Sequence, residues 1–148
     1  MKTLYIDMDN VLVDFGSGID QLCEKTKAEF HERYDEVPGI FATMKPFPEA
    51  LESYRLLCRH FDTYILSSTP WNNPGAAADK IGWVRRYLGD VAEKRLILSH
   101  HKNLCAGDFL VDDRTKNGAE NFCGKHIHFA TPEFPDWKSV VEYLMERK

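Results

Sequence analysis

Five short apolar runs, each ended by polar residues, predict the strands of a sheet. They are residues 3–7 (TLYID), 62–68 (DTYILSS), 95–99 (RLILS), 108–113 (DFLVDD) and 126–130 (HIHFA). Their apolar positions are continuous rather than alternating, which is typical of strands covered on both faces. The runs therefore favour a parallel sheet.

Helical periodicity fills most of the chain between these runs. Residues 48–61, 77–89 and 136–148 each repeat apolar side chains at spacings of three and four, which is typical of a helix packed on one face. Strands that alternate with such helices predict an α/β fold, a doubly wound (Rossmann-like) parallel sheet.

One segment interrupts the alternation directly after the first strand. Residues 17–34 have the pattern of an amphipathic helix, and a Pro/Gly break follows at residues 37–41 (VPGIF). We expect residues 16–46 to form a small helical cap, with a core of residues 1–15 and 47–148. A chain of 148 residues fits one such domain.

Composition and charge limit the possible binding partners of the protein and its cellular location. A net charge of -4 without a basic run argues against a nucleic-acid polymer as partner. No segment approaches the ~20 apolar residues of a membrane span, and the first apolar run is too short for a signal peptide. The four cysteines are scattered without a CxxC motif, so we expect reduced, mostly packed thiols. These features predict a cytoplasmic protein and leave its oligomeric state open.

Polar side chains with catalytic potential follow four of the predicted strands. They are Asp7 and Asp9, then Ser67, Ser68 and Thr69, then His100, His101 and Lys102, and finally Asp112 and Asp113. The carboxyl ends of parallel strands share one edge of the sheet, where ligands bind. Carboxylates, hydroxyls and a lysine are compatible there if they hold a hard cation and an oxyanion. Each of these groups alone is common in turns and helix caps, and two adjacent histidines rarely bind the same metal ion. Their occurrence in order, each at the end of a separate strand, predicts a functional site.

These motifs resemble those of the haloacid dehalogenase superfamily of aspartate-nucleophile phosphatases. D7-M-D9-N-V resembles its first motif, YILSS its second, Lys102 its third and FLVDDR its acidic fourth. Within the superfamily, DMDNVLVDF together with STPW and HKN…LVDDR is most similar to the 5'(3')-deoxyribonucleotidases, over nearly the whole chain. Asn10 stands where those enzymes would have glycine, and Asn tolerates the left-handed conformation that glycine favours.

The resemblance implies a Mg²⁺-dependent phosphomonoesterase that hydrolyses nucleoside monophosphates through a phosphoaspartate. It assigns Asp7 as the nucleophile and Asp9 as the general acid and later base. Mg²⁺ would bind the Asp7 side chain, the Asp9 backbone carbonyl, and Asp112 or Asp113, between which the sequence does not decide. Ser68 is the expected phosphate donor, assisted by Thr69 and Lys102, with Ser67 as the alternative.

An aromatic substrate pocket is expected between core and cap. Its candidates are Phe15 and Phe41, for which plain core packing is an equal alternative, and Trp71 at the entrance. The base and the sugar stay open. Other possibilities are a phosphatase of a sugar phosphate or phosphoglycolate, or a non-catalytic phosphate-binding module. A binding module has no need for both a nucleophile and a general acid.

Overall fold

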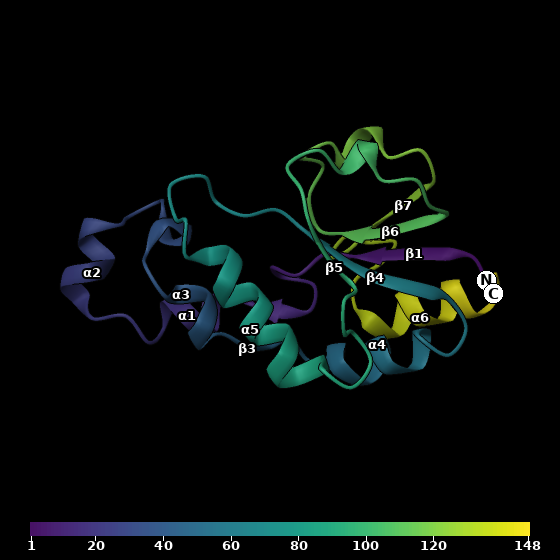
Figure 1. The fold of residues 1–148 in the computed structure, drawn as a ribbon, viewed down its shortest axis with the longest axis horizontal. Coiled ribbons are helices and arrows are strands. Elements are labelled where there is room, and N and C mark those ends of the chain that lie inside the picture. Colours follow the sequence, from purple (N-terminus) through teal and green to yellow (C-terminus); the bar gives the residue numbers. More distant parts are fainter.

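A central parallel sheet organises the protein, whose computed structural model describes residues 1–148 (Figure 1). Its strands, in spatial order, are β5 (Leu96–Leu98), β4 (Asp62–Ser67), β1 (Thr3–Ile6), β6 (Phe109–Asp112) and β7 (Lys125–His128). All neighbouring strands are parallel. The five predicted strands and their parallel arrangement are therefore confirmed, with slightly different bounds.

Three helices pack on one face of this sheet. They are α4 (Ala50–Leu57), α5 (Ala76–Leu88) and α6 (Trp137–Met145), close to the three helices predicted there. Helix α6 begins at a capping box, in which Asp136 and Ser139 satisfy each other's backbone N–H groups. Figure 1 shows α4 and α6 side by side beneath the strands, with both chain ends nearby.

The opposite face of the sheet has a thinner cover. Side chains alternate along a strand, so Leu4 and Ile6 join the core under the helices while Tyr5 points the other way. Tyr5 packs there with Phe122, beside the short 3₁₀ turns η2 (Lys102–Leu104) and η3 (Ala119–Asn121). The predicted α/β class is confirmed, with 3₁₀ turns on this face because the β5–β6 and β6–β7 connections are too short for long helices.

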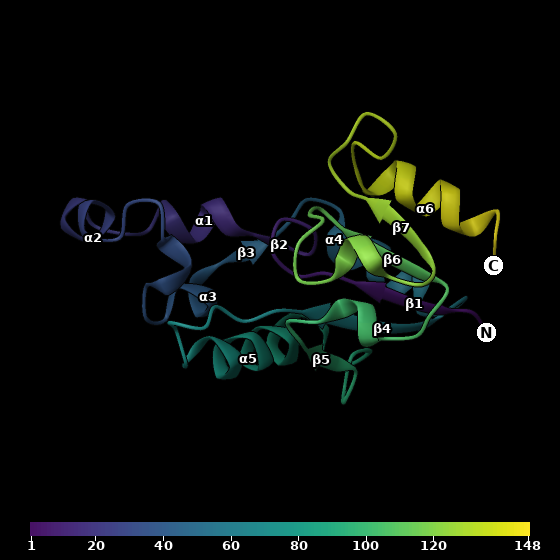
Figure 2. The ribbon, with the colours of Figure 1, turned by 90° about the horizontal axis from the view of Figure 1, so that it is seen from above.

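The segment after β1 extends away from the chain ends (Figure 2). It contains α1 (Phe15–Ile19), α2 (Glu24–Glu29), η1 (Tyr34–Glu36) and α3 (Ile40–Thr43), and its base is the antiparallel pair β2 (Val13–Asp14) and β3 (Lys45–Pro46). Asp14 caps α1 by accepting the Ser17 N–H.

The single helix predicted over residues 17–34 is wrong, because the segment forms two short helices. Two glycines, Gly16 and Gly18, weaken the first helix. The Gln21 side-chain amide then donates to the carbonyls of Ser17 and Thr43, at 3.0 and 2.8 Å, which ties the turn to α3. The backbone of Cys23 is extended, which interrupts the helix, and α2 begins directly after it.

All four cysteines are free, and none of the helices is long and apolar enough to cross a membrane. Cys58 and Cys105 are partly buried, but Cys23 and Cys123 are exposed. The expectation of mostly packed thiols is therefore wrong for these two, which lie in loops outside the core.

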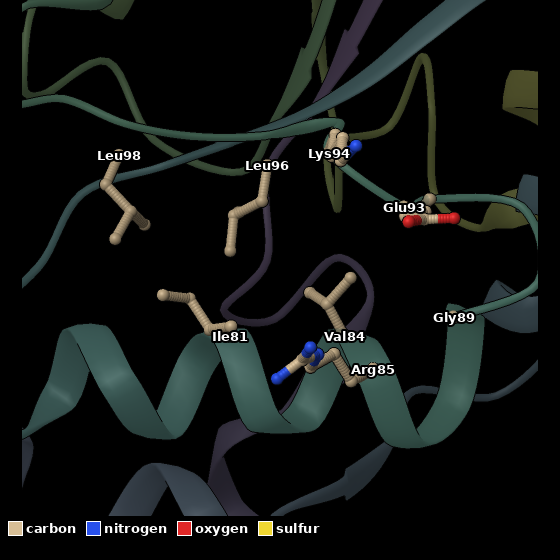
Figure 3. Close-up of a pocket in the computed structure, with 9 residues that line it drawn as sticks. Ile81, Val84, Arg85, Gly89, Glu93, Lys94, Leu96 and Leu98 are labelled. Atoms are coloured by element: carbon tan, nitrogen blue, oxygen red, sulfur yellow. The ribbon is translucent and has the colours of Figure 1, made fainter.

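A cavity of about 780 Å³ lies between α5 and the edge strand β5 (Figure 3). Ile81, Val84, Leu96 and Leu98 line it with apolar side chains, and Arg85 lies at its rim. It contains none of the carboxylates, hydroxyls or lysines that the sequence singled out. The cavity therefore lies at an edge of the sheet, apart from the predicted site residues.

Replacement of Trp137 tests how the core supports the loop after β1. Its buried ring packs on Phe129, and its Nε1–H donates to the Val11 carbonyl at 2.8 Å. We expect Trp137→Ala to lower the free energy of unfolding by about 3–5 kcal/mol. Trp137→Phe should lower it by about 1–3 kcal/mol, because the Val11 carbonyl loses its buried donor.

Urea denaturation measures both variants. Trp71→Phe is the matched control, because Trp71 is 86% exposed and its replacement should leave the unfolding free energy unchanged. A Trp137→Phe variant as stable as the wild type would contradict the proposed support of the loop.

Candidate active site

A tight loop after β1 places Asp7 and Asp9 at the carboxyl edge of the sheet. The carbonyl of Met8 accepts the N–H groups of residues 11–13, so the chain folds back on itself at once. Asn10 takes the left-handed conformation, with φ of 59°, as expected for the residue in the glycine position. Asp7 and Asp9 then line one small cavity.

Lys102 brings the ends of β1 and β6 together. Its side chain is only 3% exposed, and its Nζ donates to Asp7 Oδ1 at 2.9 Å and to Asp112 Oδ2 at 2.6 Å. Burial would lower the pKa of Lys102, but the two carboxylates outweigh it and raise that pKa. Lys102 therefore stays charged, and since an ammonium group has three N–H donors, one is left for a further acceptor.

Asp112 and Asp113, which follow each other at the end of β6, differ in their partners. Asp112 uses both oxygens, one for Lys102 and one for the Arg114 N–H at 2.9 Å. Asp113 Oδ1 is buried without any hydrogen-bond partner. Burial, reinforced by the charge of Asp7, raises the pKa of Asp112 to about 6 and that of Asp113 to about 7.

The carboxylates of Asp7, Asp112 and Asp113 could hold a metal ion. Each offers an oxygen within 4.8 Å of the others. Hard divalent cations such as Mg²⁺ prefer carboxylate oxygens, and a cation would compensate charges that otherwise repel one another. The unpartnered Asp113 oxygen fits such a ligand, which favours Asp113 over Asp112 for direct contact.

The two serines after β4 point to different places. Ser67 is buried, and its Oγ accepts from Lys80 Nζ at 2.9 Å and donates to the Ser68 carbonyl at 3.2 Å. Ser68 lines the cavity with Asp7, and its Oγ accepts from Asn117 at 3.1 Å. Ser68 is thus placed to meet a ligand in the cavity, while the alternative, Ser67, is engaged inside the fold.

Lys80 is a site residue that the sequence reasoning missed. It lies on α5 and is 1% exposed, and its Nζ donates to Asp9 Oδ2 at 3.0 Å. A signal for it exists, because Ala76, Lys80, Val84 and Leu88 recur every four residues on the buried face of that helix. A lysine in an apolar stripe calls for a buried partner.

Three further residues of the cavity were also missed. Arg114, Lys116 and Asn117 line it together with Asp7 and Lys102. They follow the fourth acidic motif directly (DDRTKN), so their place beside a strand end could have indicated them. They add positive charge and amide donors to an acidic site.

A larger pocket of about 520 Å³ adjoins this cavity, and Asp9 and Ser68 line both. The predicted substrate-pocket residues, Phe15, Phe41 and Trp71, all line it together with Thr69 and His100. The rings of Phe15 and Phe41 meet edge to face at 5.9 Å. Phe41 also belongs to the main hydrophobic core, so its side chain both lines the pocket and packs in the core.

The histidines after β5 are not placed as metal ligands. His100 Nε2 bonds to the Thr69 carbonyl at 2.6 Å, and its ring meets that of Trp71 edge to face. His101 is exposed. The one group of three or more possible metal-binding side chains is the carboxylate set of Asp7, Asp112 and Asp113.

Comparison with known proteins identifies the family of the chain. The family model of the 5' nucleotidase, deoxy (pyrimidine), cytosolic type C protein matches residues 16–137. The chain belongs to this family. The predicted resemblance and the predicted class of enzyme, a phosphomonoester hydrolase of the nucleotidase type, are therefore confirmed.

Individual relatives extend the likeness over almost the whole chain. Two of them carry the name "Putative 5'(3')-deoxyribonucleotidase". The one from Vibrio phage KVP40 is 63% identical, over 95% of this chain and 83% of its own. The one from Bordetella bronchiseptica is 32% identical, over 93% and 94%.

A solved structure supports the fold. The structure named "putative haloacid dehalogenase-like hydrolase", from Burkholderia xenovorans LB400, aligns with a TM-score of 0.54, over 97% of this chain and 96% of its own. At 15% identity this likeness concerns the fold alone.

The raised pKa values predict how the metal-free protein responds to pH. Asp112 and Asp113 bind protons more tightly in the folded chain than in the unfolded chain, where Asp has a pKa of about 3.9. Stability is therefore lost as the pH rises through 6 and 7. In EDTA, the free energy of unfolding should be about 1–3 kcal/mol higher at pH 5.5 than at pH 8.

Urea denaturation at both pH values, with Asp113→Asn beside the wild type, tests this. Burial lowers the pKa of His126, which makes the protein more stable as the pH rises. This effect is the same in both proteins, so the difference between their pH dependences reports the contribution of the Asp113 carboxylate. The variant should depend less on pH. Equal pH dependence in the two proteins would contradict the assignment.

Proposed function

We propose that this protein is a Mg²⁺-dependent 5'(3')-deoxyribonucleotidase that acts through a phosphoaspartate. The observation that carries the proposal is the convergence of Asp7, Asp9, Ser68 and Lys102 on one cavity, beside a cluster of three carboxylates. The names of the relatives support a nucleotide as the small-molecule substrate.

Phosphate binding must overcome the charge of the nucleophile. Two unit charges about 4 Å apart repel by ~4 kcal/mol at an effective dielectric constant near 20. The free N–H of Lys102 and the side chains of Arg114 and Lys116 bring positive charge to the same cavity. Ser68 and Asn117 add neutral donors, with Thr69 nearby in the larger pocket, so the phosphoryl oxygens would be surrounded by donors.

Asp7 and Asp9 then divide the chemistry. The Asp7 carboxylate forms a bond to phosphorus, and the bond from phosphorus to the nucleoside oxygen breaks. Asp9 gives its proton to that oxygen, and afterwards takes a proton from the water that attacks the phosphoaspartate. Burial raises the pKa of Asp9 despite the opposing effect of Lys80, which suits a carboxyl group that must hold a proton.

The same residues fit a magnesium ion. Asp7, Asp113 and the Asp9 backbone carbonyl would hold it, with Asp112 bound mainly to Lys102. A bound Mg²⁺ supplies positive charge that stabilises the transferring phosphoryl group. Lys102 fixes Asp7 and Asp112 in place beside it.

The inserted segment gives the site its substrate range. We assign residues 16–46 as a cap, with Phe15 and Phe41 beside the base and Trp71, 86% exposed, at the entrance. A pocket of about 520 Å³ suits a nucleoside monophosphate rather than a polymer. A cytoplasmic enzyme of nucleotide breakdown, without a membrane or nucleic-acid partner, is consistent with this site.

A phosphate-release assay tests the activity. Wild-type protein with Mg²⁺ should release phosphate from deoxynucleoside monophosphates, and Asp7→Asn should lower kcat at least about 10³-fold, because the nucleophile is lost. Asp20→Asn is the control, since Asp20 is exposed directly after α1 and should be dispensable. Full turnover by Asp7→Asn would overturn the mechanism, and activity on sugar phosphates alone would overturn the nucleotidase assignment.

Metal binding can be measured without turnover. At constant ionic strength and pH 7.5, Mg²⁺ at 100 times its Kd should stabilise the wild type by about 2.7 kcal/mol, seen as a higher Tm. Asp113→Asn should lose most of this shift, because the free carboxylate oxygen is gone, while Asp20→Asn keeps it. An undiminished shift in Asp113→Asn would exclude Asp113 as a ligand.

A further inference from the structure

Lys80 reaches the active site from a different element than the four strand-end motifs. It lies in the first half of α5, is 1% exposed, and extends its Nζ to the loop after β1. There it donates to Asp9 Oδ2 at 3.0 Å, to Ser67 Oγ at 2.9 Å and to the Ser68 carbonyl at 2.6 Å.

These contacts use every donor that the ammonium group has. A lysine carries three N–H groups and no acceptor, and Lys80 has three acceptors in hydrogen-bond range. Lys80 also does not line the small cavity that holds Asp7 and Lys102. It therefore has no donor left for a phosphoryl oxygen, in contrast to Lys102.

The two oxygens of Asp9 are consequently unequal. Oδ2 is held by Lys80, while Oδ1 is buried and has no partner in the protein. Asp9 lines both the small cavity and the larger pocket, where the leaving oxygen of a substrate would lie. A proton on Asp9 would thus reside on Oδ1, because Oδ2 is occupied by a donor.

We propose that Lys80 is a positioning residue, which holds Asp9 through Oδ2 and so keeps on Oδ1 the proton that Asp9 gives to the leaving oxygen. This rests on the proposed nucleotidase function and adds to it a residue that none of the four motifs contains. Lys80 acts through Asp9 and does not touch the substrate.

The helix that carries Lys80 is also attached to the cap. Lys80 Nζ lies 4.6 Å from the centre of the Phe41 ring, a cation–π contact, and Trp83 Nε1 donates to the Met44 carbonyl at 3.0 Å. Phe41 is at the same time a wall of the larger pocket. The position of Asp9 therefore depends on the seating of α5 against residues 40–44.

Two substrates with different leaving groups separate positioning of the acid from other roles. A deoxynucleoside monophosphate releases an alcohol that needs a proton, while p-nitrophenyl phosphate releases a phenolate that does not. We expect Lys80→Met to lower kcat on the nucleotide by about 10²-fold or more with little change in KM, and to lower turnover of the aryl ester far less.

The ratio of the two activities does not depend on the fraction of folded enzyme, because unfolding lowers both equally. If Lys80→Met does not fold, Lys80→Gln replaces it, because glutamine keeps a shorter, neutral hydrogen-bond donor. The same ratio of activities on the two substrates is then measured for this variant. Arg85→Met is the matched control, since Arg85 is an exposed cation on the same helix and lines neither pocket that Asp9 lines, so the ratio should stay at the wild-type value.

A double-mutant cycle tests the route of the effect. In an Asp9→Asn background, Lys80→Met should cause little further loss, because the group that Lys80 positions has lost its function. Equal losses on both substrates, a raised KM with unchanged kcat, or a full additional loss beyond Asp9→Asn would each overturn the proposal. Wild-type protein inactive on every nucleotide would instead refute the proposed function itself.

Discussion

The candidate active site depends on the burial of like charges at the carboxyl edge of the sheet. Asp7, Asp112 and Asp113 each place an oxygen within 4.8 Å of the others, where water is largely excluded. Burial and mutual repulsion both oppose the charged forms, as the raised pKa values of Asp112 and Asp113 show. The Lys102 ammonium group is the compensating charge inside the protein, and it bridges β1 and β6 as it does so.

Much of this site could be predicted because its residues follow strands. A buried apolar run that stops at a carboxylate or hydroxyl signals both the strand and its functional end, and parallel topology then brings the ends together. Asp7, Ser68, Lys102 and Asp112 were reached in this way, although they are far apart in sequence. The sequence could not decide which of Asp112 and Asp113 would contact a metal ion directly, because only the three-dimensional structure shows which carboxylate oxygen lacks a hydrogen-bond partner.

Other parts of the structure carried no comparable signal. Lys80 occupies a position that periodicity assigns to the helix core, so its chemistry becomes visible only when α5 is seen to pack on the loop after β1. The prediction of a single helix over residues 17–34 was wrong for a similar reason. Its apolar spacing fits one helix, but the Gln21 amide makes a tertiary contact to Thr43 that periodicity does not encode. Local pattern predicts elements well and contacts between them poorly.

The two buried lysines show how one residue type can serve two purposes in one site. Lys102 is held by two carboxylates and keeps one donor free, so its charge can meet a phosphoryl oxygen. Lys80 spends all three donors on Asp9 and the Ser67–Ser68 turn, so its effect on a substrate can only be indirect. Because a buried ammonium group is costly unless it is fully paired, this saturation also explains how α5 can carry a lysine in its apolar face. Counting free donors therefore distinguishes a ligand-binding lysine from a positioning one where burial and charge alone do not.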